Sequence, residues 1–332
     1  MIRFAVIGTN KITDNFIEAA KLCKEFELVA VYSRTKDRAV EYANKHSIKL
    51  VYDDLEKLAA SKEVDAVYVA SPNSFHSKHS IMMLNSKKHV LCEKAIASNK
   101  KELEAMLKAA ENNGVILLEA MRSVFDPGFE AIEDNISKLG VIRRATFQYC
   151  QYSSRYDNFK KGIVENAFNP IFSNGALMDI GVYCIHPLVK LFGMPKKLWA
   201  NAVILKNGVD GAGTITLNYE NMQAELLYSK ITNSKLPSQI QGENGCMIIK
   251  EIPDTREITI IYNNGQEESI PINKYDNNMY YEVEEFIRLI ETKGNAQEHN
   301  KYSIMEVSIL DEVRKQIGIT FPADSYMEDK ND

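Results

Sequence analysis

The sequence lacks the features that mark several classes of protein. Its five cysteines (Cys23, Cys92, Cys150, Cys184 and Cys246) are scattered without metal-ligand spacing, so we expect free thiols, a cytoplasmic location and no bound metal. A formal net charge of -5 and the absence of a basic cluster exclude a nucleic-acid footprint. No apolar run approaches membrane-spanning length, and the chain begins on a predicted strand, so we expect neither a membrane span nor a signal peptide.

Two domains are expected, because 332 residues exceed what one hydrophobic core usually serves. Up to residue 120, strands and helices alternate strictly, which predicts an α/β fold with a doubly wound parallel sheet over 1–120. Its predicted strands are 2–7, 28–32, 50–52, 66–70, 89–92 and 115–118. Longer strands predict an α+β domain over 121–332 with a large, mostly antiparallel open sheet. They are expected at 141–152, 199–205, 213–219, 223–229, 238–241, 246–250 and 257–262, with helices at 280–291 and 303–317 closing the chain.

The first predicted strand ends in a glycine turn, Gly8-Thr9-Asn10, and a helix containing Ile12 follows. A strand, a glycine turn and a helix in this order occupy the position of a dinucleotide-binding fingerprint. Asn10 and Thr13 replace the second and third glycines. We expect Asn10 to make the turn in a left-handed backbone conformation, which asparagine tolerates well. A strand-turn-helix unit without a cofactor is the alternative.

The second predicted strand ends in Ser33-Arg34. Sites that prefer NAD usually carry an acid here, bound to the ribose 2′-hydroxyl. A hydroxyl followed by a guanidinium group suits a 2′-phosphate instead, which favours NADP. The nearby Asp37 keeps NAD open, and a surface-loop role for Arg34 is the alternative.

Three further predicted strands end in small, polar or charged residues: Ser71, Pro72, Asn73 and His76 after the first, Glu93 and Lys94 after the second, and Ala120 after the third. Ligands of open α/β sheets bind outside the carboxyl ends of the strands. A lysine there, beside a carboxylate, can hold or release a proton at the ligand. For Lys94 a surface ion pair is the alternative.

The segment 173–188 is predicted to be a helix. Its Asp179, Tyr183 and His186 are spaced to lie on one face, which suits the binding of a ligand, although a half-exposed polar stripe would give the same pattern. The preceding loop, 153–169, holds Arg155 and Asn166. We expect both to contact substrate unless this loop is a flexible surface segment.

Taken together, these motifs resemble the Gfo/Idh/MocA oxidoreductases over nearly the whole chain. The residues that carry the resemblance are Ile7-Gly8-Thr9, Ser33-Arg34, Ser71-Pro72-Asn73-Ser74-Phe75-His76, Cys92-Glu93-Lys94 and the run from Gly175 to Tyr183. The resemblance implies a Rossmann domain, an α+β domain with an open sheet, and NAD(P)-dependent hydride transfer on a sugar, polyol or related carbonyl.

The resemblance also implies roles for single residues. Lys94 looks like the catalytic lysine, and Glu93 resembles the neighbour that holds the nicotinamide ribose. Asp179 matches the acid that positions substrate, and Tyr183 is similar to the proton donor of the branch with glucose-fructose oxidoreductase and dihydrodiol dehydrogenase. Ala95 departs from the family, which usually has proline there.

The leading hypothesis is therefore an NADP-dependent oxidoreductase acting on a small sugar-like molecule, with NAD possible. Two alternatives remain open: a non-catalytic dinucleotide sensor of the same fold, and a redox-neutral reaction that recycles the cofactor within the site. The open face of the second sheet predicts a homodimer or higher homo-oligomer.

Overall fold

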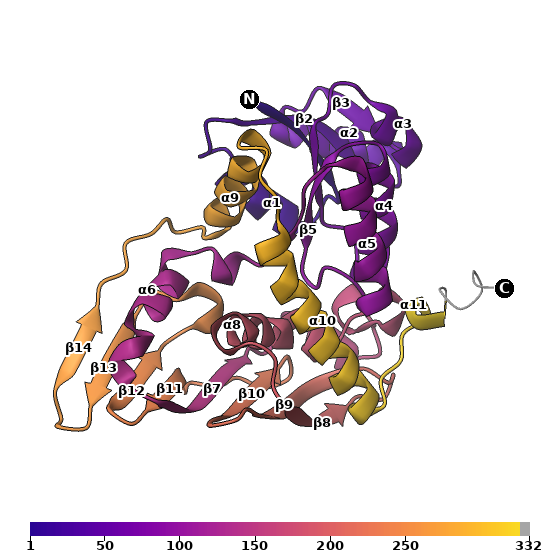
Figure 1. The fold of residues 1–332 in the computed structure, drawn as a ribbon. Coiled ribbons are helices and arrows are strands. Elements are labelled where there is room, and N and C mark those ends of the chain that lie inside the picture. Colours follow the sequence, from indigo (N-terminus) through magenta and orange to yellow (C-terminus); the bar gives the residue numbers. More distant parts are fainter. Residues whose placement is uncertain (326–332) are drawn as a thin grey trace. The chain divides into compact units, whose positions relative to one another are not determined.

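Residues 1–325 are described by the computed structural model, and they divide into two units (Figure 1). Unit 1 comprises Met1–Ala120 and Tyr275–Ser303, and unit 2 comprises Met121–Lys274 and the chain from Ile304 onward. The sequence pattern places every residue after 120 in the second domain, whereas 275–303 lie in unit 1. The reason is that helix α9 (Met279–Glu291) packs on helix α1 (Lys11–Ala20), with the Phe286 ring 5.9 Å from that of Phe4.

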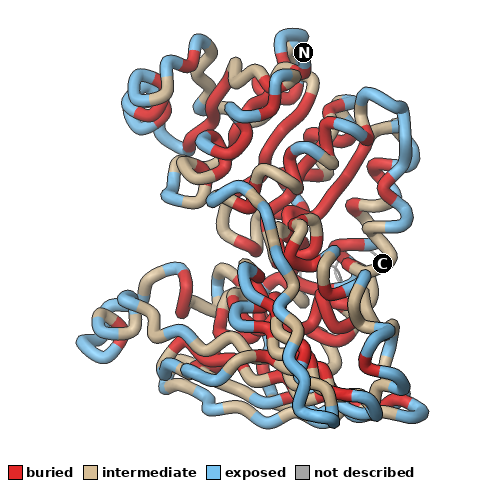
Figure 2. The backbone as a smooth tube through the Cα atoms, turned by 90° about the vertical axis from the view of Figure 1, so that its left-hand side faces the viewer, coloured by how far each residue is buried: buried red, intermediate tan, exposed pale blue. Residues whose placement is uncertain are grey.

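Unit 1 contains a parallel sheet in the order β3-β2-β1-β4-β5-β6. Its strands are β1 (Ile2–Ile7), β2 (Phe26–Tyr32), β3 (Leu50–Tyr52), β4 (Ala66–Val69), β5 (His89–Glu93) and β6 (Leu117–Ala120). All six predicted strands are present, the sixth displaced by two residues to Leu117–Ala120. Most residues of these strands are buried, except in β3, and Figure 2 shows buried backbone running through this unit. The strand order reverses between β1 and β4, the switch point at which such sheets bind ligands.

Helices cover this sheet. Besides α1 and α9 they are α2 (Lys36–His46), α3 (Leu55–Ala60), α4 (His76–Asn85), α5 (Lys100–Asn113) and the first residues of α10 (Gln297–Ile317). Side chains cap the amino ends of α1, α3 and α5. Asn99 caps α5 by accepting a hydrogen bond from the Glu102 backbone N–H at 3.0 Å. The Glu102 carboxylate in turn accepts from the Ser98 N–H at 2.8 Å, which ties the start of α5 to the loop before it.

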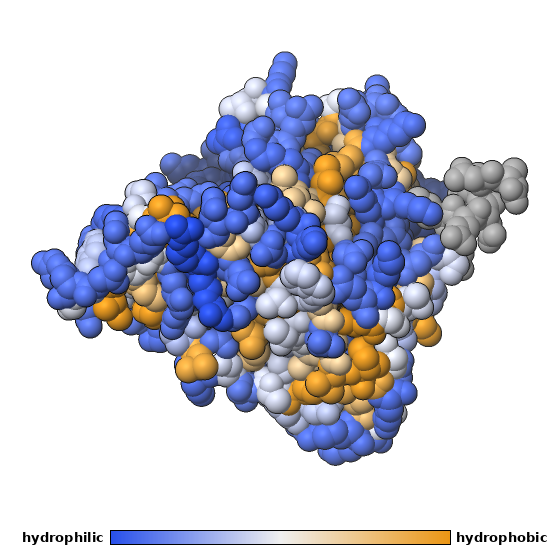
Figure 3. Space-filling model, turned by 60° about the horizontal axis from the view of Figure 1, so that its bottom comes forward, coloured by the Kyte–Doolittle hydropathy of each residue, from blue (hydrophilic) through white to orange (hydrophobic). Residues whose placement is uncertain are grey.

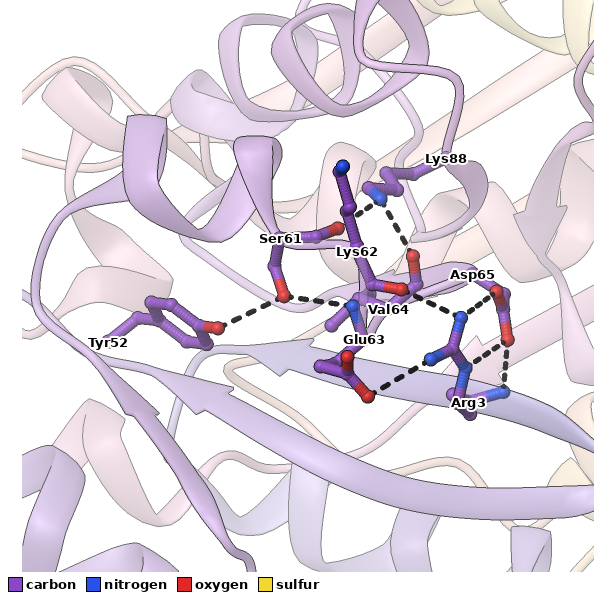
Figure 4. A network of polar contacts seen from close by, with 8 residues as sticks. All are labelled: Arg3, Tyr52, Ser61, Lys62, Glu63, Val64, Asp65 and Lys88. Atoms are coloured by element: carbon purple, nitrogen blue, oxygen red, sulfur yellow. Dashed lines mark hydrogen bonds and ion pairs between the residues drawn. The ribbon is translucent and has the colours of Figure 1, made fainter.

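A polar network joins the amino ends of the strands (Figure 4). Arg3 on β1 donates from Nε and Nη2 to the two carboxylate oxygens of Asp65, which precedes β4, at 2.9 and 2.8 Å. Lys88, which precedes β5, donates to the carbonyl oxygen of Val64 at 2.7 Å. These bonds fix three neighbouring strands at the edge opposite to the carboxyl ends.

Unit 2 contains a sheet in the order β14-β13-β12-β11-β7-β10-β9-β8, in which only β7 and β10 run parallel to each other. The strands are β7 (Ile142–Cys150), β8 (Lys197–Ile204), β9 (Asp210–Asn218), β10 (Gln223–Ser229), β11 (Ser238–Gly242), β12 (Gly245–Ile249), β13 (Ile258–Tyr262) and β14 (Glu267–Ile270). The mostly antiparallel sheet is confirmed. Strand β14 was not predicted, because it is short and polar and lies at an edge.

One face of this sheet is covered by helix α8 (Val182–Phe192), which contacts β7 and β10. The other helices of the unit are α6 (Pro127–Asn135), α7 (Ser154–Lys160), the rest of α10, and α11 (Pro322–Ser325). Contrary to expectation, one segment, Pro170–Phe192, is apolar and long enough to span a membrane, with a mean hydropathy of 1.3. Its most apolar window is 78% buried, as in the core helix of a soluble protein.

The opposite face of the sheet carries exposed apolar side chains. Trp199 and Val203 lie on the same side of β8 and are 56% and 55% exposed. Trp199 pairs with Thr216 of β9, and Thr216 pairs with Glu225 of β10, so these three side chains lie on the same face of the sheet. Leu226, the residue after Glu225, points to the other face, which α8 covers, and is buried. Figure 3 turns the bottom of Figure 1 toward the viewer and shows apolar side chains gathered on that surface.

Candidate active site

The turn after β1 is built around a close approach that requires glycine. Gly8 has φ +117°, and a Cβ atom there would lie 2.6 Å from the carbonyl oxygen of Ala70, at the end of β4. The expectation of a left-handed Asn10 is wrong, because its φ of -107° and ψ of 178° are extended. Asn10 instead caps α1, accepting from the Thr13 N–H at 3.1 Å and donating to the Ala70 oxygen at 3.0 Å.

Asn10 and Thr13 occupy the positions at which a glycine-rich loop has its second and third glycines, and these side-chain hydrogen bonds stabilise the turn in their place. Thr9 and Ile12 are half-buried at the start of α1, beside its free N–H groups. A helix amino terminus presents N–H donors and a partial positive charge, which suits the pyrophosphate of a dinucleotide.

Two arginines stand near the carboxyl ends of β1 and β2. Arg34 is exposed and makes no hydrogen bond or ion pair within residues 1–325, whereas the neighbouring Ser33 is buried. Arg38 on α2 was missed by the sequence analysis. Its Nε donates to Thr9 Oγ1 at 2.6 Å, and its Nη2 donates to the Thr9 carbonyl at 3.1 Å. Its place in the first turn of the helix that follows β2, four residues after Arg34, was the available signal.

His76 joins the loops that follow β4 and β5. Its Nδ1 lies 2.9 Å from the Ala95 carbonyl oxygen, and its Nε2 lies 2.7 Å from that of Ser71. Burial and, to a smaller extent, the nearby charge of Lys94 lower the pKa of His76 to about 4, although its hydrogen bonds to Ala95 and Ser71 oppose this shift. The ring is therefore neutral at pH 7, and both of its nitrogens face the protein.

The backbone around Lys94 is held by several side chains. Lys94 is half-buried and follows Glu93, which is buried and accepts a hydrogen bond from the Tyr68 hydroxyl. The Lys94–Ala95 peptide bond is cis. The Ile96 N–H donates to Glu119 Oε1 at 3.0 Å, a role of Glu119 that the sequence analysis missed.

The remaining predicted residues of unit 1 lie at the same edge. Ser71 follows β4, and its hydroxyl lies 3.0 Å from Nδ1 of His79. Pro72 leads into the short 3₁₀ turn Asn73–Phe75, and Ala120 ends β6. The carboxyl ends of β1, β2, β4, β5 and β6 therefore bring together every predicted cofactor-binding residue of this unit.

The polar residues of unit 2 do not share one α-helical face as predicted. Leu177–Gly181 forms a π-helical turn, and α8 begins only at Val182, so the wider turn changes the direction of Asp179 relative to Tyr183. Such turns are rare and occur frequently at functional sites. The Asp179 side chain is 30% exposed, whereas Tyr183 and His186 are 7% and 4% exposed.

Each of these three residues has its own partner. Asp179 Oδ2 lies 2.7 Å from Nζ of Lys230. The Tyr183 hydroxyl accepts from Arg122 Nε at 3.4 Å, and the Arg122 guanidinium also lies over the tyrosine ring, 5.5 Å from its centroid. His186 Nδ1 lies 2.6 Å from the buried carboxylate Glu306, which favours a structural role for this histidine.

The segment 153–169 is ordered by an apolar cluster of Phe159, Ala167, Phe168 and Val209. It forms α7 and the 3₁₀ turn Asn166–Phe168. Arg155 and Asn166 are both exposed on it, and Arg155 lies 3.5 Å from Glu165. The expected loop is therefore a packed helical segment.

A buried acid on β9 supports the π-helical turn. Asp210 Oδ2 accepts from the Leu177 N–H at 2.6 Å, and a Cβ atom on Gly175 would lie 2.2 Å from Asp210 Oδ1. Burial raises the pKa of Asp210 to about 6, although its hydrogen bonds and the charge of Lys230 oppose this rise. No local pattern in the sequence indicates this contact.

Known proteins match the chain along its length. Residues 2–121 match an oxidoreductase family with an NAD-binding Rossmann fold, and residues 135–248 match the Gfo/Idh/MocA C-terminal domain. The scyllo-inositol 2-dehydrogenase (NADP(+)) IolU of Bacillus subtilis is 49% identical, over 98% of this chain and 99% of its own. The trans-1,2-dihydrobenzene-1,2-diol dehydrogenase of Danio rerio is 30% identical, over 98% and 99%.

Solved structures show the same fold. KijD10, a 3-ketoreductase from Actinomadura kijaniata in complex with NADP and TDP-benzene, has a TM-score of 0.84 at 21% identity, covering 95% of this chain and 98% of its own. The aldose-aldose oxidoreductase of Caulobacter crescentus, complexed with glycerol, has a TM-score of 0.82 at 19% identity, covering 95% and 97%. The family and domain matches together show that the chain belongs to the Gfo/Idh/MocA family of oxidoreductases.

Proposed function

We propose that the chain is an NADP-dependent oxidoreductase that acts on a secondary alcohol, or the corresponding ketone, of a cyclic polyol or related sugar. The observation that carries this proposal is the 49% identity, over 98% of the chain, to a relative named as an NADP-dependent scyllo-inositol dehydrogenase. The cofactor, when bound, supplies the hydride chemistry. The protein supplies binding, orientation and proton transfer.

The carboxyl edge of unit 1 fits a dinucleotide. Gly8 leaves room that a Cβ atom would fill, and α1 directs its free N–H groups to the same turn. Along this edge we place the following cofactor-binding residues: Gly8, Thr9, Asn10, Ile12, Ser71, Pro72, Asn73, Glu93, Lys94 and Ala120. Because both ring nitrogens of His76 face carbonyl oxygens, we propose that this residue shapes the site without touching the cofactor itself.

The arginines favour NADP over NAD. Arg34 is exposed next to Ser33, and Arg38 is held at the β1 turn by Thr9. Two guanidinium groups and a hydroxyl suit a ribose 2′-phosphate. Asp37 lies in the first turn of α2, so it does not occupy the position after β2 at which an acid binds the 2′-hydroxyl of NAD.

We assign proton transfer at the reacting oxygen to Lys94 and Tyr183, and substrate positioning to Asp179. The exposed fraction of Asp179 leaves part of its carboxylate able to accept from a substrate hydroxyl. Arg155 and Asn166 remain proposed substrate contacts on the exposed side of their segment.

A fluorescence titration with NADPH and NADH, followed by assays of scyllo-inositol with NADP⁺ and of a carbonyl panel with NADPH, tests this proposal. Removal of Arg34 or Arg38 by alanine substitution should weaken NADPH binding by roughly tenfold or more and leave NADH binding unchanged, because charged hydrogen bonds are lost. Arg288→Ala on α9 is the matched control. Binding without any turnover would favour the dinucleotide sensor, and tighter binding of NADH than of NADPH would contradict the assignment of the arginines.

We also propose that the chain forms a homodimer, with a second copy covering the exposed face that carries Trp199 and Val203. Trp199 and Val203 are each more than half exposed, and exposed apolar side chains that lie together often mark a protein–protein interface. Light scattering should give twice the mass of the chain, and a monomer would contradict the proposal. A cytoplasmic location is proposed from the free cysteines, and cell fractionation tests it.

A further inference from the structure

Lys230 is a buried cation in unit 2 that the sequence analysis does not single out. Its side chain is 2% exposed, and it directly follows β10. Its backbone is fixed on both sides, since its N–H donates to the Gly211 carbonyl and its own carbonyl accepts from the Ser153 N–H, both at 2.9 Å. A buried ammonium group is costly unless it is paired, so its partners indicate its purpose.

The Lys230 ammonium group links two segments that the proposed function uses. It lies 2.7 Å from Asp179 Oδ2 in the π-helical turn. It donates to the Ala167 carbonyl at 2.6 Å and lies 4.6 Å from the centroid of the Phe168 ring. One cation therefore joins the acid proposed to position substrate to the segment that carries Asn166.

The two side chains of the Asp179–Lys230 ion pair are not equally accessible to a ligand. Asp179 keeps 30% of its side chain exposed, whereas Lys230 keeps 2%. A small molecule can reach the Asp179 side chain but not the ammonium group. Lys230 can therefore act on a substrate only indirectly, and its contacts with Asp179 and with the Ala167 segment provide two routes.

We propose that Lys230 is a positioning residue for polyol recognition: it holds the Asp179 carboxylate in the orientation that accepts a substrate hydroxyl and fixes the segment containing Asn166 beside it. This inference rests on the proposed function. It predicts a defect in substrate binding that leaves cofactor binding intact.

The test compares Lys230→Met with wild type in scyllo-inositol oxidation by NADP⁺. The KM for scyllo-inositol should rise roughly tenfold to hundredfold, as expected when a charged hydrogen bond orienting the carboxylate is lost. The dissociation constant for NADPH, measured by fluorescence, should not change. Lys230→Arg keeps the cation and should restore most of the loss in KM.

Lys274→Met is the matched control, because Lys274 is also 2% exposed in unit 2 and is paired with Asp126 and Asp254, both at 2.6 Å. It should lower thermal stability as Lys230→Met does while leaving the KM unchanged. In an Asp179→Asn background, Lys230→Met should cause no further rise in KM, since the two residues act as one.

The inference would be overturned if folded Lys230→Met had an unchanged KM. It would also be overturned if Lys230→Met raised the KM as much in the Asp179→Asn background as in wild type. If Lys230→Met does not fold, Lys230→Arg provides the test. A folded Lys230→Arg variant whose KM is as high as that of Asp179→Asn would also overturn the inference. If wild type oxidises no polyol at all, the proposed function fails and this inference fails with it. Turnover by wild type with a normal KM in Lys230→Met overturns the inference alone.

Discussion

Substitution of Asp210 by asparagine tests how one buried acid governs the segment that carries Asp179 and Tyr183. Asp210 is 2% exposed, and burial raises its pKa from 3.8 to about 6. The folded chain therefore binds this proton more tightly than the unfolded chain does. The resulting stability is fully present below about pH 3.8 and is lost as the pH rises through about 6. The difference between these pKa values corresponds to roughly 3 kcal/mol over the full titration.

Asparagine keeps an oxygen that can accept from the Leu177 N–H but cannot ionise. Between pH 4 and pH 7, wild type should therefore lose roughly 2 kcal/mol of unfolding free energy relative to Asp210→Asn. Urea unfolding followed by circular dichroism at several pH values in this range measures the difference for both chains. A difference between wild type and Asp210→Asn that stays constant over this pH range would refute the reasoning.

Two further predictions concern the proposed active site. Lys94→Ala and Tyr183→Phe should each lower kcat by roughly 10²-fold or more without unfolding the protein, as loss of a general acid or base does. Steady-state kinetics with scyllo-inositol checks this, and normal turnover of a variant would exclude that residue from proton transfer. Gly8→Ala should lower the melting temperature and weaken NADPH binding, because its Cβ atom would lie 2.6 Å from the Ala70 oxygen. Gly114→Ala, also at positive φ but with open space around it, should leave NADPH binding unchanged.

The sequence predicts the parallel sheet of unit 1 well, because each of its strands is a local apolar run followed by a small or polar residue. The same pattern places Gly8, Arg34 and Lys94 at one edge. Strand β14 escaped prediction because its residues 267–270 include two glutamates and a serine, so its pairing with β13 depends on the hairpin turn more than on its own composition. Local pattern finds buried strands better than polar edge strands.

The partners of the site residues could not be predicted, because they come from distant parts of the chain. Nothing near Asp179 in the sequence indicates that Lys230 will face it, and nothing near Leu177 indicates Asp210. The one-face arrangement expected of Asp179, Tyr183 and His186 assumed a regular α-helix, and a single π-helical turn was enough to alter it. Helical spacing therefore identified residues of interest without fixing their directions.

The position of residues 275–303 in unit 1 has a consequence for the order in which the protein is made. The buried Phe286 of α9 packs against Phe4 of β1, and the Asn300 side chain donates to the Leu117 carbonyl of β6 at 3.1 Å. A nascent chain that has emerged only as far as Ala120 lacks both contacts and leaves an aromatic surface uncovered. The cofactor-binding unit is therefore incomplete until residue 303 has emerged, although most of it is made first, and until then this surface needs protection from aggregation.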